Sequence, residues 1–359
     1  MAIQQILHTA NFSKENITQL LSVSGNDERA LFGYASRIKQ QHVGNTVYLR
    51  GLIEFSNICE KNCYYCGIRH DNNDTHRYCL TDNEVLDAVR FAHENGFGSV
   101  AIQSGELSSD AFTRKIDFIL KEAMRITNGE IGITLSCGEQ SEEVYRRWFE
   151  SGAKRYLLRI ESSYEELYYK IHPKNQEHSF TQRLNALESL KEIGYQTGTG
   201  VMIGLPFQTA EYLANDLLFM KQFDIDMCGM GPYIEHAQTP LYEHKVALLP
   251  LRERLNLSLK MVALLRILMP DINIAATTAL QTFEKNGRER AIQIGANVLM
   301  PNITPKHYRD DYFLYENKPV SQQSNEDDLK FLEEQLKNIG HEIGYFGQGN
   351  SKHYRKNRS

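Results

Sequence analysis

Long apolar runs, excess charge and cysteine are all scarce in this chain of 359 residues. No stretch approaches the about 18 consecutive apolar residues that suggest a membrane-spanning helix. The N-terminal segment has no basic region followed by an apolar run, so we expect no signal peptide. The formal net charge is only −5. We therefore expect binding neither to nucleic acid nor to a membrane surface.

Cysteine occurs at only six positions, 59, 63, 66, 79, 137 and 228. The last three are scattered singly, which is unlike the disulfide framework of a secreted protein and favours the reducing cytoplasm. Cys137 and Cys228 lie in apolar runs, where a free cysteine behaves as a small hydrophobic residue. The composition, with 41% hydrophobic and 24% charged residues, is ordinary for a soluble globular enzyme.

Eight short apolar or β-branched runs alternate with amphipathic helical stretches, which is typical of βαβ units and a parallel sheet. The runs cover residues 46–57, 98–105, 130–138, 155–162, 197–205, 226–234, 273–280 and 296–301. The helical stretches between them cover residues 82–95, 109–127, 140–151, 180–194, 209–223, 252–268 and 284–294. Eight such units predict an α/β fold with a complete (β/α)8 TIM barrel. An open, doubly wound sheet is the structural alternative.

The regions on either side of the barrel have a different pattern. Residues 1–45 are predicted to form an N-terminal helical segment, and residues 46–315 the barrel. Residues 316–359 are predicted to form a C-terminal extension with a helix over 325–340 and a polar, basic tail from 347. We expect this tail to be frayed and solvated.

In such a barrel the active site lies where the strands end, at the C-terminal rim. Polar, charged and glycine residues gather at the ends of the runs, whereas the interiors of the runs stay apolar. These ends carry Gln103 to Glu106, Ser136 to Glu139, Arg159, Glu161, Met202, Gly204, Pro232, Tyr233, Thr277, Thr278, Pro301 and Asn302. The pattern predicts a site built from residues far apart in the sequence.

The first run leads into CEKNCYYC, in which Cys59, Cys63 and Cys66 have the spacing C-x3-C-x2-C. Thiolates are soft ligands for zinc, copper or iron–sulfur clusters. A closed zinc site needs four ligands, and His70 or Cys79 could supply the fourth. An iron–sulfur cubane normally takes four cysteines, so three would leave one iron open to bind an amine and a carboxylate. The spacing alone leaves both readings open.

The position of this motif after the first strand resembles that of the radical S-adenosylmethionine (SAM) superfamily, and Tyr65 before Cys66 agrees with it. The resemblance implies that Cys59, Cys63 and Cys66 are the metal ligands of a catalytic 4Fe-4S cluster whose open iron binds the methionine end of SAM. It also implies that the reduced cluster splits a carbon–sulfur bond of SAM and releases a 5′-deoxyadenosyl radical.

The stretch after the second run supplies the next element in the superfamily's order. Gln103, Ser104, Gly105 and Glu106 resemble the element that holds the SAM amino group. A carboxylate or a backbone carbonyl can bind an ammonium, and glycine lets the main chain come close. Alternatively, Glu106 is a charge at a helix N-terminus, where the helix dipole favours it.

Further cofactor-binding residues follow at the fourth and fifth runs. Glu161 and Arg183 resemble the pair that contacts the ribose hydroxyls and the SAM carboxylate, and Met202 and Gly204 resemble the fifth-strand element beside the adenine. The structural alternatives are an internal salt bridge between Glu161 and Arg183, and tight packing at the glycine.

Longer stretches between Ala30 and Tyr315 resemble the FeFe-hydrogenase maturase family HydE, whose relatives include methylornithine synthase and biotin synthase. These stretches are IEFSNICEKNCYYCGIRHDN, IQSGE, ITLSCGE, RYLLRIES, GLPFQT, ATTAL, GANVLMPNITP and HYRDDY. The resemblance implies a polar substrate cavity lined by Thr134, Ser136, Arg159, Thr277, Thr278 and Tyr308. Alternatively, Arg159 and Glu161 satisfy each other, since strand alternation points them to the same side. Tyr308 could also be a packed aromatic of the barrel lid.

The implied reaction is a step in the assembly of the hydrogenase's diiron subcluster. The adenosyl radical attacks a sulfur of a cysteine-bound iron carbonyl–cyanide precursor, a small molecule supplied by a partner maturase. The product passes to the scaffold maturase, and an external electron donor reduces the cluster. No cysteine follows Cys228, so we expect one 4Fe-4S cluster with SAM and no auxiliary cluster in the last third of the chain.

Two other functions stay open at the level of the sequence. One is an amino-acid mutase of the methylornithine synthase type acting on lysine, which would need a carboxylate or carbonyl for the distal ammonium. The other is a non-catalytic iron–sulfur or zinc scaffold. A biotin synthase activity is weakly supported, because only Cys137 and Cys228 could serve a second cluster inside the barrel.

Overall fold

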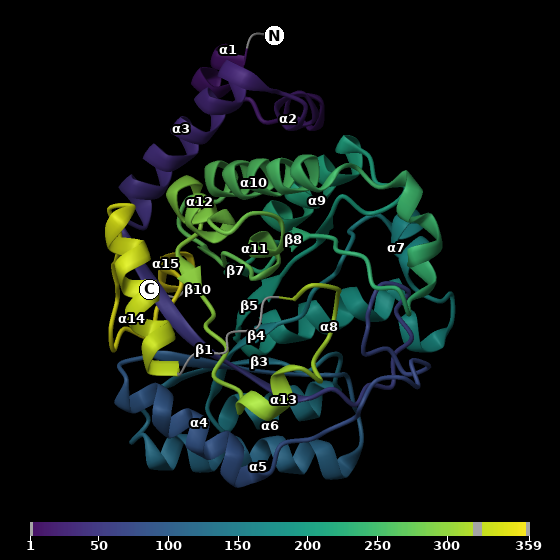
Figure 1. The fold of residues 1–359 in the computed structure, drawn as a ribbon, viewed down its shortest axis with the longest axis vertical. Coiled ribbons are helices and arrows are strands. Elements are labelled where there is room, and N and C mark those ends of the chain that lie inside the picture. The colour runs from purple at the N-terminus through teal and green to yellow at the C-terminus, as the bar shows by residue number, and fades with distance from the viewer. Residues whose placement is uncertain (1–2, 319–324, 357–359) are drawn as a thin grey trace.

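The computed structural model describes residues 3–318 and 325–356. Its centre is a curled sheet of parallel strands with helices around it (Figure 1). The strands are β1 (Thr46–Ser56), β2 (Ser99–Ser104), β3 (Gly132–Ser136), β4 (Ala153–Leu157), β5 (Gln196–Thr199), β6 (Met202–Ile203), β7 (Met227–Cys228), β8 (Gly231–Pro232), β9 (Asn273–Ile274), β10 (Val298–Leu299) and β11 (Glu342–Ile343).

Eight of these strands form one path, in the order β10-β1-β2-β3-β4-β5-β7-β9, and every neighbouring pair is parallel. Strand β11 pairs with the start of β1, and β6 pairs with β8 beyond the ends of β5 and β7. An isolated parallel bridge joins Ala275, just after β9, to Val298 in β10. The sequence-based prediction of an α/β fold with a parallel sheet is confirmed to the level of a curled, eight-stranded sheet.

The longer helices match the predicted helical stretches closely. The α-helices are α1 (Ile3–Thr9), α2 (Lys14–Leu21), α3 (Gly25–His42), α4 (Asp82–Glu94), α5 (Asp110–Ile126), α6 (Glu142–Glu150), α7 (Glu165–Ile171), α8 (Phe180–Ile193), α9 (Ala210–Phe223), α10 (Leu251–Leu268), α11 (Ala279–Phe283), α12 (Gly287–Ile294), α13 (Lys306–Arg309), α14 (Asn325–Asn338) and α15 (Lys352–Lys356). Ser or Thr side chains accept a backbone N–H at the start of α2, α4, α5, α6, α8 and α9. These caps satisfy amides that have no partner inside the helix and so fix where each helix begins.

The predicted strands 197–205 and 226–234 each form two short strands, β5 with β6 and β7 with β8, and two other predicted strands end well before their expected last residue. Strand β4 ends at Leu157, so Arg159 and Glu161 lie beyond the regular ladder. There the Thr199 hydroxyl donates to Leu158 O at 2.8 Å and accepts the Ile160 amide at 3.0 Å, which takes the place of ladder bonds. The run 273–280 likewise stops as a strand at Ile274, and α11 begins at Ala279.

The prediction of a frayed, solvated tail is wrong for its described part, which ends at residue 356. Asn350 Oδ1 accepts from Arg155 Nη2 at 2.5 Å and from Gln196 Nε2 at 2.8 Å, and Gly349 O accepts from Asn273 Nδ2 at 2.8 Å. Buried donors at the N-terminal ends of the strands need acceptors, and Gly349 and Asn350 of the tail supply them. Residues 357–359 of the predicted tail lie outside the described part of the chain.

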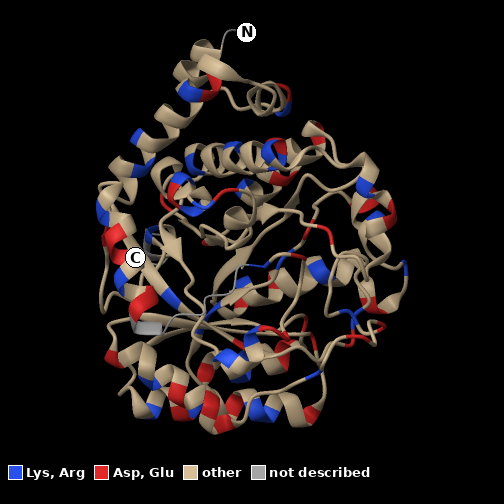
Figure 2. Cartoon of the chain, viewed as in Figure 1, with Lys and Arg blue, Asp and Glu red and all other residues tan. Residues whose placement is uncertain are grey.

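The remaining surface is ordinary in charge. In the view of Figure 2, Lys and Arg are interspersed with Asp and Glu over the outer helices. Helices α2 and α3 pack against α9 and α10. Within residues 3–318 and 325–356, no helix combines the length and the apolar character that crossing a membrane requires.

Candidate active site

A cavity of about 370 Å³ runs inside the curled sheet, from the cysteine loop at the C-terminal ends of the strands to Arg50 and Asn273 near their N-terminal ends. It is lined by Cys59, Cys63, Cys66, Tyr65, Gln103, Ser104, Gly105, Glu106, Thr134, Ser136, Arg159, Glu161, Arg183, Met202, Thr277 and Thr278, all of which the sequence singled out. Gly204 and Tyr308 do not line it. The structure thus brings residues from most of the chain to one cavity.

The loop between β1 and α4 carries the three cysteines and has little regular structure of its own. Arg77 holds it together, because its guanidinium donates to the carbonyls of Asn57, Ile68 and Arg69 at 2.6–2.8 Å. Backbone carbonyls in an irregular loop need such partners when they are buried. No motif or pattern in the sequence pointed to this role of Arg77.

Gly67, directly after the third cysteine, fixes how the loop meets the segment that follows α13. Its amide donates to Leu314 O at 3.0 Å, and a Cβ at this position would lie 2.1 Å from Phe313 O. Asn72 Nδ2 donates back to Gly67 O at 2.6 Å. The stretch GIRHDN therefore seats the cysteine loop under residues 312–315.

The three thiols belong to half-buried side chains that line one end of the cavity. Burial raises the pKa of Cys63 to about 12, and the nearby Cys59 raises it further. Burial also raises the pKa of Cys66 well above its ordinary value, and Cys63 and Cys59 add to that effect. The backbone amides of Lys61 and Glu106 both donate to Cys59 Sγ at 3.4 Å. Thiolates this close together need a cationic group among them, which suits an iron–sulfur cluster.

Neither of the two residues considered for a closed zinc site joins the thiols. His70 Nδ1 lies 2.9 Å from Asp71 Oδ1, and Cys79 Sγ lies 3.5 Å from Lys115 Nζ. Neither side chain lines the cavity that the three thiols share. Among the described residues no group of three His, Cys, Asp or Glu side chains is arranged to hold a single metal ion.

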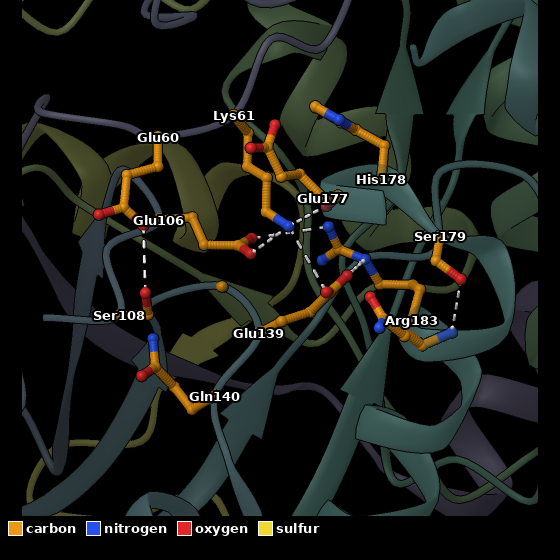
Figure 3. A network of polar contacts seen from close by, with 12 residues as sticks. Glu60, Lys61, Glu106, Ser108, Glu139, Gln140, Glu177, His178, Ser179 and Arg183 are labelled. Carbon is orange, nitrogen blue, oxygen red and sulfur yellow. Dashed lines mark hydrogen bonds and ion pairs between the residues drawn. The ribbon is translucent and has the colours of Figure 1, made fainter. Parts of the chain in front are cut away.

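Four charged side chains form a closed set beside the cysteine loop (Figure 3). Lys61 Nζ lies 3.0 Å from Glu106 and 3.6 Å from Glu139, whereas Arg183 lies 2.6 Å from Glu139 and 3.6 Å from Glu106. Burial raises the pKa of Glu106, and Arg183 opposes that rise. Glu106 precedes α5 by four residues and so lies outside the first turn, which removes the helix-charge alternative.

Glu139 and Lys61 were not selected from the sequence as site residues. Glu139 was noted only as part of the end of the third run, and Lys61 lies inside C-x3-C. Both positions follow a strand end, which was the signal that could have found them. Gly138, which has φ 74°, lets the Glu106 side chain pass close to the main chain after β3. A Cβ at residue 138 would lie 2.1 Å from Glu106 Cγ.

Glu161 and Arg183, which the sequence predicts to act as a pair, have different ion-pair partners: Arg159 for Glu161 and Glu139 for Arg183. Glu161 lies 2.9 Å from Arg159, whose Nη2 also donates to Val201 O at 3.0 Å. Burial raises the pKa of Glu161, and Arg159 opposes that rise. Glu161 has φ 63°, a left-handed conformation that is strained for a residue with a side chain. The Arg159–Glu161 alternative is therefore present in the structure, and an internal Glu161–Arg183 bridge is not.

Tyr65 is oriented by a histidine that the sequence did not indicate. The His172 ring bonds through Nδ1 to Tyr168 O at 2.9 Å, so Nδ1 carries the hydrogen. His172 Nε2 then accepts from the Tyr65 hydroxyl at 3.1 Å. Burial lowers the pKa of His172 well below its ordinary value, which keeps the ring neutral. Tyr65 and Met202 belong to one small apolar cluster.

The remaining wall of the cavity holds residues that were missed. They are Arg50, Glu54, Tyr312, Tyr315 and Lys318. Lys318 Nζ lies 2.5 Å from Glu54 Oε1, which ties the end of the segment after α13 to β1. The stretch HYRDDYFLY contains three tyrosines, of which Tyr308 was expected at the cavity. Tyr312 and Tyr315 line it instead.

Tyr308 lies outside the cavity and stacks on Tyr78 with ring centroids 4.8 Å apart. Gly204 has φ 80° and packs against Arg254, where a Cβ would lie 2.7 Å from Cγ. For both residues the structure agrees with the packing alternative. The Thr134 hydroxyl, by contrast, is buried on the cavity wall without a hydrogen-bond partner among the described residues.

The chain is similar to known proteins in both sequence and fold. Residues 53–220 match the model of the radical SAM superfamily. The chain is 44% identical over 319 residues to the FeFe hydrogenase maturase subunit HydE of Thermotoga maritima, covering 88% of this chain and 87% of that protein. The chain belongs to the HydE family. It is therefore a radical SAM enzyme of the hydrogenase-maturase type, and its family implies a 4Fe-4S cluster and SAM as cofactors.

HydE-family membership agrees with two more distant likenesses. The chain is 27% identical to the 3-methylornithine synthase of Methanosarcina acetivorans, over 82% of this chain and 81% of that protein. The crystal structure of a methylornithine synthase, PylB, matches with a TM-score of 0.80 at 22% identity, over 96% of this chain and 97% of that one. The second likeness shows that the fold is shared.

Proposed function

We propose that this HydE-family chain reductively cleaves SAM at one 4Fe-4S cluster and directs the 5′-deoxyadenosyl radical onto a sulfur of a cysteine-derived iron carbonyl–cyanide precursor. This step belongs to the assembly of the FeFe-hydrogenase diiron subcluster. The observation that carries the proposal is the placement of Cys59, Cys63 and Cys66 at one end of a cavity inside the curled sheet, whose walls carry paired charges. A cluster bound there would supply the electron that cleaves SAM.

The residues next to the thiols suit the parts of SAM. Glu106 can accept the ammonium and Arg183 can donate to the carboxylate. Glu161, which follows β4, can accept the ribose hydroxyls, and Tyr65 and Met202 offer apolar surface for the adenine. Gln103, Ser104 and Gly105 bring the main chain after β2 close to the cysteine loop, where a Cβ on Gly105 would lie 2.2 Å from Ile58 O.

The deeper part of the cavity suits a polar, anionic substrate. Arg159, Thr134, Ser136, Thr277 and Thr278 line it and offer hydrogen-bond donors. Tyr308 is not part of this proposal, because it lies outside the cavity; Tyr312 and Tyr315 line the wall instead. An enclosed site holds a carbon radical within contact of its target and away from water.

The cavity gives less support to a lysine mutase. Such an enzyme needs a free carboxylate or carbonyl for the distal ammonium of lysine. Each carboxylate on the wall already has a cationic partner: Glu54 has Lys318, Glu106 has Lys61, and Glu161 has Arg159. Glu106 and Glu161 are assigned to SAM, so Glu54, which lies 2.5 Å from Lys318, is the wall carboxylate left for the ammonium of lysine.

Further features of the proposal rest on the sequence and on single contacts. No cysteine follows Cys228, which supports one cluster. A partner maturase would supply the precursor, a scaffold maturase would receive the product, and an external donor would reduce the cluster in the cytoplasm. The Ala275–Val298 bridge supports a complete barrel. The domain division at residues 45 and 315 stays a prediction.

The decisive experiment is reconstitution with iron and sulfide, reduction with dithionite, addition of SAM and detection of 5′-deoxyadenosine. We expect product from the wild type and none from Cys63→Ala, together with loss of the cluster's visible absorbance. Cys79→Ala is the matched control, since this cysteine lies in the same loop outside the cavity, and it should keep both. One tightly bound zinc and no 5′-deoxyadenosine would overturn the proposal, and conversion of added lysine would favour the mutase.

A further inference from the structure

The four-charge ring of Lys61, Glu106, Glu139 and Arg183 draws its members from four separate segments (Figure 3). Lys61 belongs to the cysteine loop, Glu106 follows β2, Glu139 follows β3, and Arg183 lies on α8. Each cation lies within 3.6 Å of both carboxylates, and the four side chains are only 10–13% exposed. Two positive and two negative charges leave the ring neutral, which makes its burial tolerable.

The distances in the ring alternate. Arg183 is held directly by Glu139 at 2.6 Å and only distantly by Glu106 at 3.6 Å. Lys61 is held directly by Glu106 at 3.0 Å and distantly by Glu139 at 3.6 Å. Lys61 Nζ also donates to the carbonyl of Glu177, which fixes it from the outer side. The guanidinium and the Glu106 carboxylate are therefore kept apart, each by its own close partner.

Only part of the ring faces the cavity. Lys61, Glu106 and Arg183 line it, whereas Glu139 lines a second, outer pocket together with Lys61 and Glu106. The ring is thus the wall between the two spaces. A ligand in the cavity would meet Lys61, Glu106 and Arg183 and would not touch Glu139.

We propose that Glu139 and Lys61 are positioning residues for the amino-acid end of SAM. Resting on the proposed function, this inference assigns the ammonium to Glu106 and the carboxylate to Arg183. Glu139 pairs closely with Arg183, and Lys61 pairs closely with Glu106, so Arg183 and Glu106 do not pair closely with each other. The ammonium and the carboxylate of SAM can then each bind a separate side chain. Without Glu139, Glu106 is the carboxylate of the ring that is left to Arg183, and without Lys61, Arg183 is the cation of the ring that is left to Glu106. In either case SAM must compete with the Arg183–Glu106 pair when it binds.

The test is equilibrium binding to reconstituted protein without reductant, using SAM and 5′-methylthioadenosine, which lacks the amino-acid end. Glu139→Gln should raise the Kd for SAM at least tenfold, or about 1.4 kcal/mol. The Kd for 5′-methylthioadenosine should stay within about twofold. Glu142→Gln is the matched control, because Glu142 lies three residues away and pairs only with Arg146 on the surface of α6. It should leave both constants unchanged.

Lys61→Met provides a second variant should Glu139→Gln fold poorly, with iron content as the check that the cysteine loop is intact. The double variant should lose at least as much SAM affinity as either single variant, since it alone leaves Arg183 and Glu106 with no other counter-charge in the ring. Equal loss of affinity for both ligands, or an unchanged Kd for SAM, would overturn the positioning role. A wild type that binds no SAM would instead overturn the proposed function, and this inference with it.

Discussion

Gly105 is the residue at which β2 passes closest to the cysteine loop. A Cβ at this position would lie 2.2 Å from Ile58 O and 2.9 Å from Cys59 Cβ, and neither atom is the far end of a flexible side chain. Its amide donates to Ser56 O at 2.8 Å, so the glycine cannot move away without breaking that bond. A side chain at residue 105 must therefore displace the loop that carries the thiols.

We expect Gly105→Ala to lower the iron content after reconstitution below half of the wild-type value. The strain of forcing a methyl group into this contact should cost about 1–3 kcal/mol of stability. Gly33→Ala is the control, because Gly33 lies inside α3 and the nearest atom to its Cβ would be Arg37 Nη1 at 3.8 Å. That change should stabilise the protein by about 0.5–1 kcal/mol. Wild-type iron content in Gly105→Ala would show that the loop can shift without losing the cluster.

At the scale of elements, α9 supports the turn after β4 that carries Glu161. Asp216 on α9 is fully buried, and its Oδ1 accepts from the Ser163 amide at 2.7 Å and from the Ser163 hydroxyl at 2.6 Å. Burial raises the pKa of Asp216 from 3.8 to about 7; the Ser163 hydrogen bonds oppose this rise, and the Glu161 charge adds to it. The Asp216 carboxyl therefore links α9 to Ser163, two residues after Glu161.

The pH dependence of stability follows from this raised pKa. The folded protein binds a proton at Asp216 between pH 4 and 7 that the unfolded chain releases, so this contribution falls as the pH rises through that range. The loss is of the order of 4 kcal/mol. Asp216→Asn should therefore raise the thermal midpoint relative to wild type more at pH 8 than at pH 5.

Asp110→Asn, a loss of the same charge on the exposed start of α5, controls for the change in net charge. Its difference from wild type should be the same at both pH values. If Asp216→Asn shows the same behaviour as this control, the buried carboxyl does not titrate as described.

At the scale of the whole molecule, the C-terminal segment closes the end of the sheet opposite the cysteines. Strand β11 pairs with Thr46 and Val47 at the start of β1, and Gly349 and Asn350 then accept from side chains of β4, β5 and β9. A Cβ on Gly98 would lie 1.9 Å from Gly347 O, so the segment passes directly against the start of β2. The C-terminal segment thus contacts the N-terminal ends of five strands of the curled sheet, namely β1, β2, β4, β5 and β9.

Asn350→Ala should lower the free energy of unfolding by about 2–3 kcal/mol, because Arg155 and Gln196 each lose a buried acceptor. Asn350→Asp is the matched variant: it keeps both acceptor positions and adds a negative charge beside Arg155, so it should lose far less. Chemical denaturation of both proteins measures the difference, and iron content should stay at the wild-type level in each. Equal destabilisation by the two changes would argue that packing, and not acceptance from Arg155, secures the segment.

Much of the fold was predictable because its signals are local. A Ser or Thr before an amphipathic stretch marks the start of a helix within one turn, as at Ser109 and Ser141, and both helices begin there. Strands were harder to bound. The run through Arg159 and Glu161 reads as one strand, but the Thr199 side chain on the neighbouring strand interrupts the ladder, which resumes only as a bridge between Glu161 and Val201. The run itself carries no signal for this interruption.

The candidate site divides in the same way. The spacing of Cys59, Cys63 and Cys66, and the polar ends of the runs, predicted which residues meet around the cavity. Sequence favoured Tyr308 over Tyr312 and Tyr315, because the turn of the segment after α13 is set by its contacts with Gly67 and Glu54, which are about 250 residues away.

By itself, the sequence determined the parallel α/β sheet, the spacing of the three thiols and the polar strand ends, since periodicity and spacing act over one strand or one helical turn. Thr134 and Arg183 were expected at the cavity only because of the family resemblance. Tertiary structure alone decided which charges are partners: Arg183 with Glu139, Glu161 with Arg159, and Lys61 with Glu106. It also decided that a polar tail is buried. The physical reason is that the balance of a buried charge depends on every counter-charge within a few ångströms, and in a barrel those come from strands far apart in the chain.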